Sequence, residues 1–162
     1  KIGRAQRALL VLAEYDGPDL RWVSANAAAL VTRNGRLVKT AGLERNLRGT
    51  HGLEDDPIAN KTFNFAGAHM RSIDLAPDGP FGVPIGSTFK VLRHESIKIL
   101  GNNHDTLVVR ELNRAQSIRW KFNNTYWLDS QTGFMWKSVQ HFDPSTKPVE
   151  IQITKPAMPV AI

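Results

Sequence analysis

The sequence predicts an all-β protein: an antiparallel, open or incompletely closed barrel-like sheet of roughly ten strands with little helix. Apolar and polar residues alternate over most of the chain, which is the period of a strand with one buried face. Gly, Asn and Pro recur between the alternating segments, as they do in turns. Almost no amphipathic helix interrupts this pattern, and we expect one all-β domain over residues 1–162.

The alternating segments place the strands in chain order. We expect them at Arg7–Tyr15, Leu20–Ala25, Ala28–Arg33, Arg36–Ala41, Phe63–Leu75, Val83–Ile99, His104–Leu112, Ser117–Leu128 (one strand or two), Phe134–His141 and Val149–Thr154. Turn residues separate many of them, at Gly17-Pro18, Asn34-Gly35, Pro77-Asp78-Gly79-Pro80, Gly101-Asn102-Asn103, Gln131-Thr132-Gly133 and Asp143-Pro144. These residues end strands because Gly can adopt a positive backbone dihedral φ without steric cost, and because the Pro ring fixes φ at a value that suits turns.

The clearest local signal is Asn34-Gly35. Asn-Gly tolerates the positive φ of a type I′ turn, so the flanking segments are predicted to form a two-residue hairpin. In that register Val31 faces Val38 and Arg33 faces Arg36. Two like charges directly opposite each other are unfavourable unless both reach water or an anion lies between them.

The segment Gly42–Lys61 lacks a clear period and is rich in Gly, Asn and Asp. We expect a long loop there, with a helical turn near Leu43–Leu47. Loops longer than about 12–15 residues are uncommon and are often functional.

The composition narrows the class of protein. The chain has 41% hydrophobic and 22% charged residues and no Cys, which excludes disulfides, thiolate metal sites and a Cys nucleophile. Its longest apolar run, Ala8–Ala13, is far short of the roughly 20 residues that span a bilayer.

Positive charge is concentrated in the first third of the chain. Residues 1–50 contain nine basic and four acidic side chains, against five and six in 51–100 and seven and five in 101–162. This excess is either a solvated surface or a face that meets phosphate, lipid headgroups or acidic polysaccharide. Nucleic acid is disfavoured, because the sequence has no dense basic run and no nucleic-acid-binding signature.

The sequence has no motif of a catalytic or metal site. Its five His residues never show H-x-H or H-E-x-x-H spacing, and there is no G-x-S-x-G, Walker or dinucleotide motif. We therefore expect no catalytic residue, no metal and no cofactor. A pair of carboxylates distant in sequence could still cleave a glycan, so a glycosidase stays an alternative.

The four Trp residues either fill a core or line a site for sugar rings or acyl chains. Arg119, Lys121 and Lys137 alternate with Trp120 and Trp136. This pattern suits a barrel with an apolar interior and a basic exterior.

Two parts of the chain carry a resemblance to a known family. They contain Ala8–Ala13, Leu20–Ala25 and Leu30–Leu43, and then Tyr126–Asp129, Thr132-Gly133 and Trp136–Gln140. Across nearly the whole chain the sequence resembles the YjbF/GfcB family of group 4 capsule and exopolysaccharide lipoproteins of Gram-negative bacteria.

The resemblance implies an all-β, periplasmic lipoprotein that a lipidated Cys anchors to the outer membrane. This sequence has no lipobox and no Cys, so we expect the anchor to lie upstream of residue 1. The family has no established catalytic residues that could be assigned to positions of this sequence. Its members resemble accessory proteins encoded beside other export components.

We therefore expect a non-enzymatic accessory lipoprotein that supports capsule or exopolysaccharide assembly or secretion by binding acidic polysaccharide or other export-operon proteins. The candidate glycan contacts are Arg33 and Arg36, whose planar forks grip carboxylates, and Trp127 and Trp136 as stacking platforms. One alternative is a lipid or lipoprotein carrier with a large apolar cavity lined by Trp and Leu. The other is a glycan-cleaving enzyme, with two carboxylates about 5–10 Å apart and a raised pKa.

Overall fold

The computed structural model describes residues 8–157 of the chain and consists almost entirely of antiparallel strands. In this part of the chain there are eleven strands and one short 3-10 helix. The elements are β1 (Leu10–Asp16), β2 (Asp19–Ser24), β3 (Ala29–Arg33), β4 (Arg36–Ala41), β5 (Asn46–His51), β6 (Ala68–Ala76), β7 (Val83–Ile99), β8 (Asn102–Ala115), η1 (Gln116–Ile118), β9 (Trp120–Asp129), β10 (Met135–Gln140) and β11 (Val149–Gln152).

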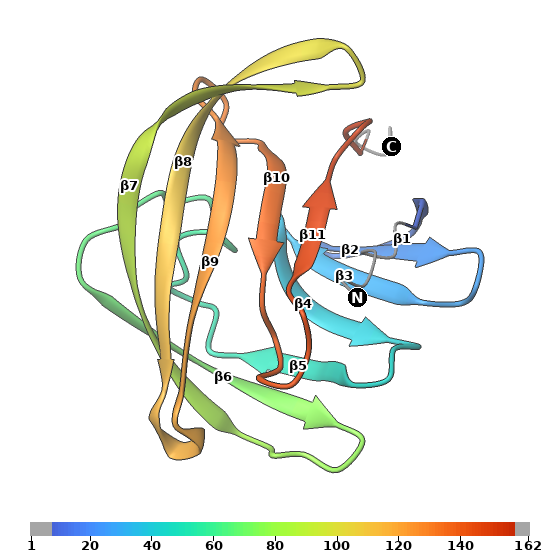
Figure 1. Cartoon of the computed structure of the whole chain (residues 1–162), viewed down its shortest axis with the longest axis vertical. Helices are drawn as coiled ribbons and strands as arrows, with labels where there is room; N and C mark the ends of the chain where they lie inside the picture. The colour runs from blue at the N-terminus through green and yellow to red at the C-terminus, as the bar shows by residue number, and fades with distance from the viewer. Residues whose placement is uncertain (1–7, 158–162) are drawn as a thin grey trace, which may run out of the picture.

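The strands form two sheets in which each strand pairs with its neighbour in the chain. The first sheet has the order β1-β2-β3-β4, and the second runs from β5 to β11. The second sheet curls into an open half-barrel, and the tip of the long β7–β8 hairpin bends over toward β10 and β11 (Figure 1). The predicted all-β, incompletely closed architecture is confirmed.

The predicted loop over Gly42–Lys61 is wrong in its first half. Asn46–His51 is strand β5, which pairs with β6, and there is no helical turn at Leu43–Leu47. A register shift between Leu47 and Gly49 breaks the alternation that would otherwise mark this strand. The strand therefore shows no clear period of two in the sequence.

The Asn34-Gly35 hairpin forms, with Arg33 opposite Arg36 as predicted. A register shift after Val31 places Lys39, not Val38, opposite Val31, so that part of the prediction is wrong. Gly35 has φ +92°, and a Cβ there would come within 2.9 Å of the Met135 Cβ. This turn therefore needs glycine both for its backbone conformation and for its close approach to β10.

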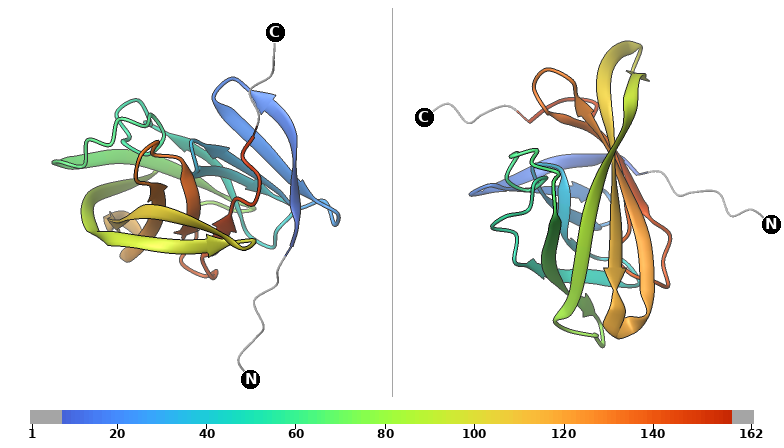
Figure 2. Two further views of the ribbon diagram at one scale, coloured as in Figure 1. Left: turned by 90° about the horizontal axis from the view of Figure 1, so that it is seen from above. Right: turned by 90° about the vertical axis from the view of Figure 1, so that its left-hand side faces the viewer.

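One apolar core joins the two sheets. Leu30 and Leu37 of the first sheet pack with residues of the second, including Leu47, Leu75 and Ile85. The two further views show the first sheet lying across one end of the half-barrel (Figure 2). The first described strand begins at Leu10, and Arg7, where the sequence predicted a start, lies outside the described residues.

Candidate functional site

The interior of the half-barrel is polar at its centre, where an apolar interior was predicted. Glu111 of β8 is completely buried and accepts hydrogen bonds from the Arg36 Nη2 at 2.8 Å and the Arg71 Nη1 at 3.1 Å. The Tyr126 hydroxyl at 2.7 Å and the Asn124 amide at 2.9 Å donate to its other oxygen. Arg36 comes from the first sheet, so this cluster ties the two sheets together.

Arg36 is consequently not a surface contact, which corrects the prediction that it grips a glycan. It is 2% exposed and donates to Asp56 as well as to Glu111. The sequence left two alternatives for Arg33 and Arg36, exposure to water or an anion between them. For Arg36 the protein itself supplies the anions, in Asp56 and Glu111. The ion-pair cluster of Arg36, Arg71, Asp56 and Glu111 contains two cations and two carboxylates, so its net charge is zero.

Glu111 and Arg36 favour their charged forms, whereas burial lowers the pKa of Arg71 from its ordinary value. Burial alone would raise the pKa of Glu111, but the charges of Arg36 and Arg71 outweigh burial and lower it well below its usual range. Burial would lower the pKa of Arg36, but the attraction of Glu111 outweighs it and raises that pKa. Both groups therefore stay ionised at neutral pH, which suits a structural ion pair and not proton transfer.

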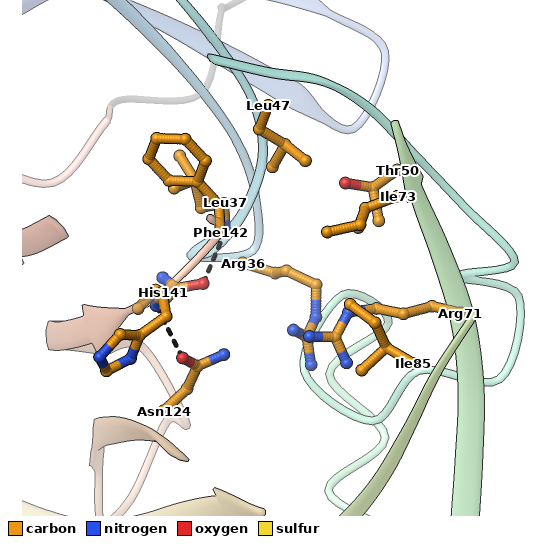
Figure 3. Close-up of a pocket in the computed structure, with 11 residues that line it drawn as sticks. Arg36, Leu37, Leu47, Thr50, Arg71, Ile73, Ile85, Asn124, His141 and Phe142 are labelled. Carbon is orange, nitrogen blue, oxygen red and sulfur yellow. Dashed lines mark hydrogen bonds between the residues drawn. The ribbon is translucent and has the colours of Figure 1, made fainter. Parts of the chain in front are cut away.

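A small cavity lies beside the ion-pair cluster. Its volume is about 20 Å³, which is room for about one water molecule. The guanidinium groups of Arg36 and Arg71 lie next to each other at its wall, and Asn124 accepts a hydrogen bond from the His141 backbone N–H (Figure 3). Polar groups fill the place where an acyl-chain carrier would need a large apolar hollow.

Asp56 fixes the segment between β5 and β6. One of its oxygens accepts the Ile58 N–H at 3.0 Å, the Ala59 N–H at 2.8 Å and the Arg36 Nε at 2.9 Å. The Asn34 side chain donates to the Ala59 carbonyl, so the β3–β4 turn holds the same segment. The second half of the predicted long loop is therefore anchored to the hairpin.

The larger cavity is an open cleft of about 400 Å³ over the first sheet. Arg33 lines it, and its guanidinium donates two hydrogen bonds to the Asp19 carboxylate, at 2.6 and 3.2 Å. Arg21 and Lys39 lie on the same face, both exposed and, among the described residues, without an ion-pair partner. Glu14 and Asp16 line the side formed by β1.

Trp127 lies on the second sheet and is half-buried. Its indole N–H donates to Glu95 at 3.0 Å, and the Lys137 ammonium lies 4.7 Å from its ring centroid. Trp127 and Lys137 are register partners and therefore share a face of the sheet.

Trp136 is half-buried close to the same face. Its ring stacks on His104 at 3.8 Å between centroids, and its indole N–H donates to Asp129 at 3.1 Å. Backbone N–H groups, Thr132 first, and the Trp136 indole lower the pKa of Asp129 to about 2. These contacts fix the ring and leave it partly accessible.

The structure does not bring the four predicted glycan contacts together. Arg33 lines the cleft, Arg36 is in the interior, and neither Trp127 nor Trp136 is among the residues that line the cleft. The sequence reasoning missed Arg71, Asp56 and Glu111. In β8 buried and exposed residues alternate around Glu111, and Glu111 falls on a buried position. This alternation was the feature of the sequence that could have identified Glu111 as an interior residue.

Residues 8–157 contain no group of three or more His, Asp or Glu side chains that could hold a metal ion. No helix in this part of the chain is long and apolar enough to cross a membrane.

The comparisons with known proteins agree with the fold. The sequence model of the family described as "Group 4 capsule polysaccharide lipoprotein gfcB, YjbF" matches residues 1–154. The chain is 32% identical over 159 residues to the uncharacterized lipoprotein GfcB of Escherichia coli (strain K12), covering 97% of this chain and 74% of that protein. It is 29% identical over 150 residues to the uncharacterized lipoprotein YjbF of the same strain, covering 91% and 69%.

A solved structure is similar as well. The crystal structure of the hypothetical lipoprotein YmcC from E. coli (K12) superposes with a TM-score of 0.85 at 32% identity, covering 94% of this chain and 80% of that one. The resemblance stated from the sequence is confirmed, and this chain belongs to the YjbF family of group 4 capsule polysaccharide lipoproteins.

Proposed function

We propose that this chain is a non-enzymatic, periplasmic accessory lipoprotein, held at the outer membrane, that supports capsule or exopolysaccharide export by binding acidic glycan. The binding site is the cleft over the first sheet. The family supports the connection with capsule polysaccharide, and the observation that carries the proposal is the set of accessible cations in the cleft.

The cleft is lined by three cations, Arg21, Arg33 and Lys39, and by three carboxylates, Glu14, Asp16 and Asp19, so the attraction for an acidic sugar polymer comes from the local pair Arg21 and Lys39. The volume of the cleft, about 400 Å³, is within the usual range for a ligand site. Arg21 and Lys39 flank Val31 across three adjacent strands, so two cations can meet successive carboxylates of a polymer. Asp19 holds Arg33 in a fixed orientation, and the carboxylates of the cleft can accept hydrogen bonds from sugar hydroxyls.

Trp127 and Trp136 form a second, separate contact region in this proposal. Each ring is half-buried, and each has a protein neighbour against it, Lys137 for Trp127 and His104 for Trp136. The partly accessible ring surfaces are available for stacking on a sugar. Because neither ring lines the cleft, a ligand that contacts both regions has to be an extended polymer and not a single sugar.

Several carboxyl groups have lowered pKa values, which supports binding of a glycan without its cleavage. A glycosidase acid needs a raised pKa so that it holds its proton near neutral pH. Hydrogen bonds lower the pKa of Asp129, through the Thr132 N–H first, and that of Glu95, through the Trp127 indole first. The buried Glu111 is likewise held as its anion by Arg36 and Arg71.

Calorimetric titration at low salt with polygalacturonate, a polymer of acidic sugars, tests this proposal. We expect measurable binding that weakens as salt is added, and no binding of neutral dextran. The double variant Arg21→Glu with Lys39→Glu should lose at least about tenfold in affinity, because two attractive charges become repulsive.

The matched control is Arg114→Glu with Lys121→Glu, which makes the same change of charge on exposed residues of the second sheet. This control should keep its affinity for polygalacturonate. Equal loss in both variants would place the site elsewhere. Absence of binding to the unmodified chain would remove the glycan and leave an export partner protein as the ligand.

A further inference from the structure

A basic patch covers the outer face of β7, β8 and β9. Its cations are Lys90, Arg110, Arg114 and Lys121, all of them exposed. Within residues 8–157 none of the four has a carboxylate at ion-pair distance or another polar partner. The three strands run side by side along one flank of the molecule (Figure 1).

The register places these cations in two directly opposed pairs. Lys90 pairs with Arg110 across β7 and β8, and Arg114 pairs with Lys121 across β8 and β9. Like charges directly opposite each other destabilise an antiparallel sheet. The fold neutralises Arg36 and Arg71 with its own carboxylates but leaves these four uncompensated, which points to an anion from outside the chain.

Apolar side chains stand on the same face as the cations. Leu112 lies between Arg110 and Arg114 on β8 and is 44% exposed, and Met70 of β6 is 63% exposed. Met70 is opposite Gly86, and Gly86 is opposite Arg114, so the sulfur side chain lies in the same row as Arg114 and Lys121. The patch therefore combines positive charge with protruding apolar groups.

We infer that this basic patch docks the domain onto an anionic lipid bilayer. Cations pair with lipid phosphates while apolar side chains enter the layer between headgroups and acyl chains, and the patch supplies both. The outer face of a sheet meets a bilayer directly, whereas an acidic polymer is better held in the cleft of the first sheet. The location beside a membrane rests on the proposed function.

The orientation that follows is specific. With the outer face of β7–β9 on the bilayer, the cleft lined by β1–β5 is on another part of the molecule and stays open to a polymer. The cleft then binds glycan while the basic patch binds lipid. Trp127 lies on the same outer face of β9 as Lys121, so in this orientation it faces the bilayer and the glycan contacts are those of the cleft.

Vesicle flotation with the purified chain tests this inference. Phosphatidylcholine vesicles that contain phosphatidylglycerol should carry the chain upward, and pure phosphatidylcholine vesicles should not. The variant Arg110→Gln with Arg114→Gln should bind the anionic vesicles roughly 30-fold more weakly, because each cation near such a surface contributes about a fivefold factor. Leu112→Ser should weaken binding by a smaller factor.

The matched control, Arg21→Gln with Lys39→Gln in the cleft, should bind vesicles as the unmodified chain does. Equal binding to both vesicle types, or an unchanged affinity of the Arg110 and Arg114 variant, would overturn the inference. A variant of the patch that loses polygalacturonate and not vesicles would also overturn it and assign the patch to the polymer. If only the cleft variants fail to bind polygalacturonate, the cleft assignment stands whatever the vesicles show, so the two proposals fail separately.

Discussion

Arg33 and Arg36 are register partners in the same hairpin, yet their environments are opposite. The Arg33 side chain is 32% exposed and pairs with Asp19, whereas the Arg36 side chain is 2% exposed and pairs with Asp56 and Glu111. A buried charge whose partner is removed is costly, while an exposed pair contributes little. Arg36 is therefore the structural residue of this hairpin, and Arg33 is the one that the proposed glycan site can use.

Replacing each arginine by methionine separates the two roles. Arg36→Met should lower the free energy of unfolding by about 3–5 kcal/mol, because Asp56 and Glu111 lose the cation between them. Arg33→Met should lower it by about 1 kcal/mol or less. Urea denaturation followed by Trp fluorescence measures both. Similar losses in the two variants would contradict the assignment of roles.

Among the secondary-structure elements, a few polar side chains fix segments that do not pair with any strand. The segment between β5 and β6 contains buried Asp56 and Ile58, although it forms no strand. Asp56 satisfies two backbone N–H groups of this segment and bonds to Arg36. One carboxylate thus connects a loop, a hairpin and the interior of the second sheet.

Asp56→Asn should release this segment. The amide cannot supply the negative charge that Arg36 requires, so amide hydrogen exchange in residues 52–61 should accelerate relative to β8 and β9. The neighbouring Asp55 is exposed, and Asp55→Asn is the matched control that should leave the exchange pattern unchanged. Equal protection in the two variants would show that other contacts hold the segment.

At the scale of the whole molecule, the stability should depend on pH through Glu111. Its pKa in the folded state is lower than the usual value because Arg36 and Arg71 outweigh the effect of burial. A lowered pKa contributes stability above the ordinary carboxyl pKa of about 4.3, and that contribution is lost as the pH falls from there toward the folded value. The carboxylate contribution should be constant above about pH 5.

Urea denaturation at a series of pH values measures this contribution. The midpoint should decrease steadily from about pH 4.5 downward, and Asp129, whose pKa is lowered to about 2, should add to the decrease from about pH 4 downward. An unchanged midpoint between about pH 5 and pH 3 would contradict a charged interior.

Most of the fold could be predicted from the sequence, because strands with one buried face leave a period of two. The Asn34-Gly35 turn and the Arg33–Arg36 register follow from local chemistry alone. The bulge after Val31 and strand β5 could not be predicted, since each depends on pairing with a distant or irregular partner. The site was harder still: the burial of Arg36 depends on Glu111, 75 positions away, and sequence spacing does not encode that contact.

We propose that this molecule recognises acidic glycan and leaves it chemically unchanged. Calorimetric titration with polygalacturonate, followed by size-exclusion chromatography of the recovered polymer, tests both halves in one sample. We predict salt-sensitive binding that depends on Arg21 and Lys39, and a polymer whose size distribution does not change. A shortened polymer would show that the chain cleaves glycan, and no heat of binding at low salt would show that it does not bind this polymer.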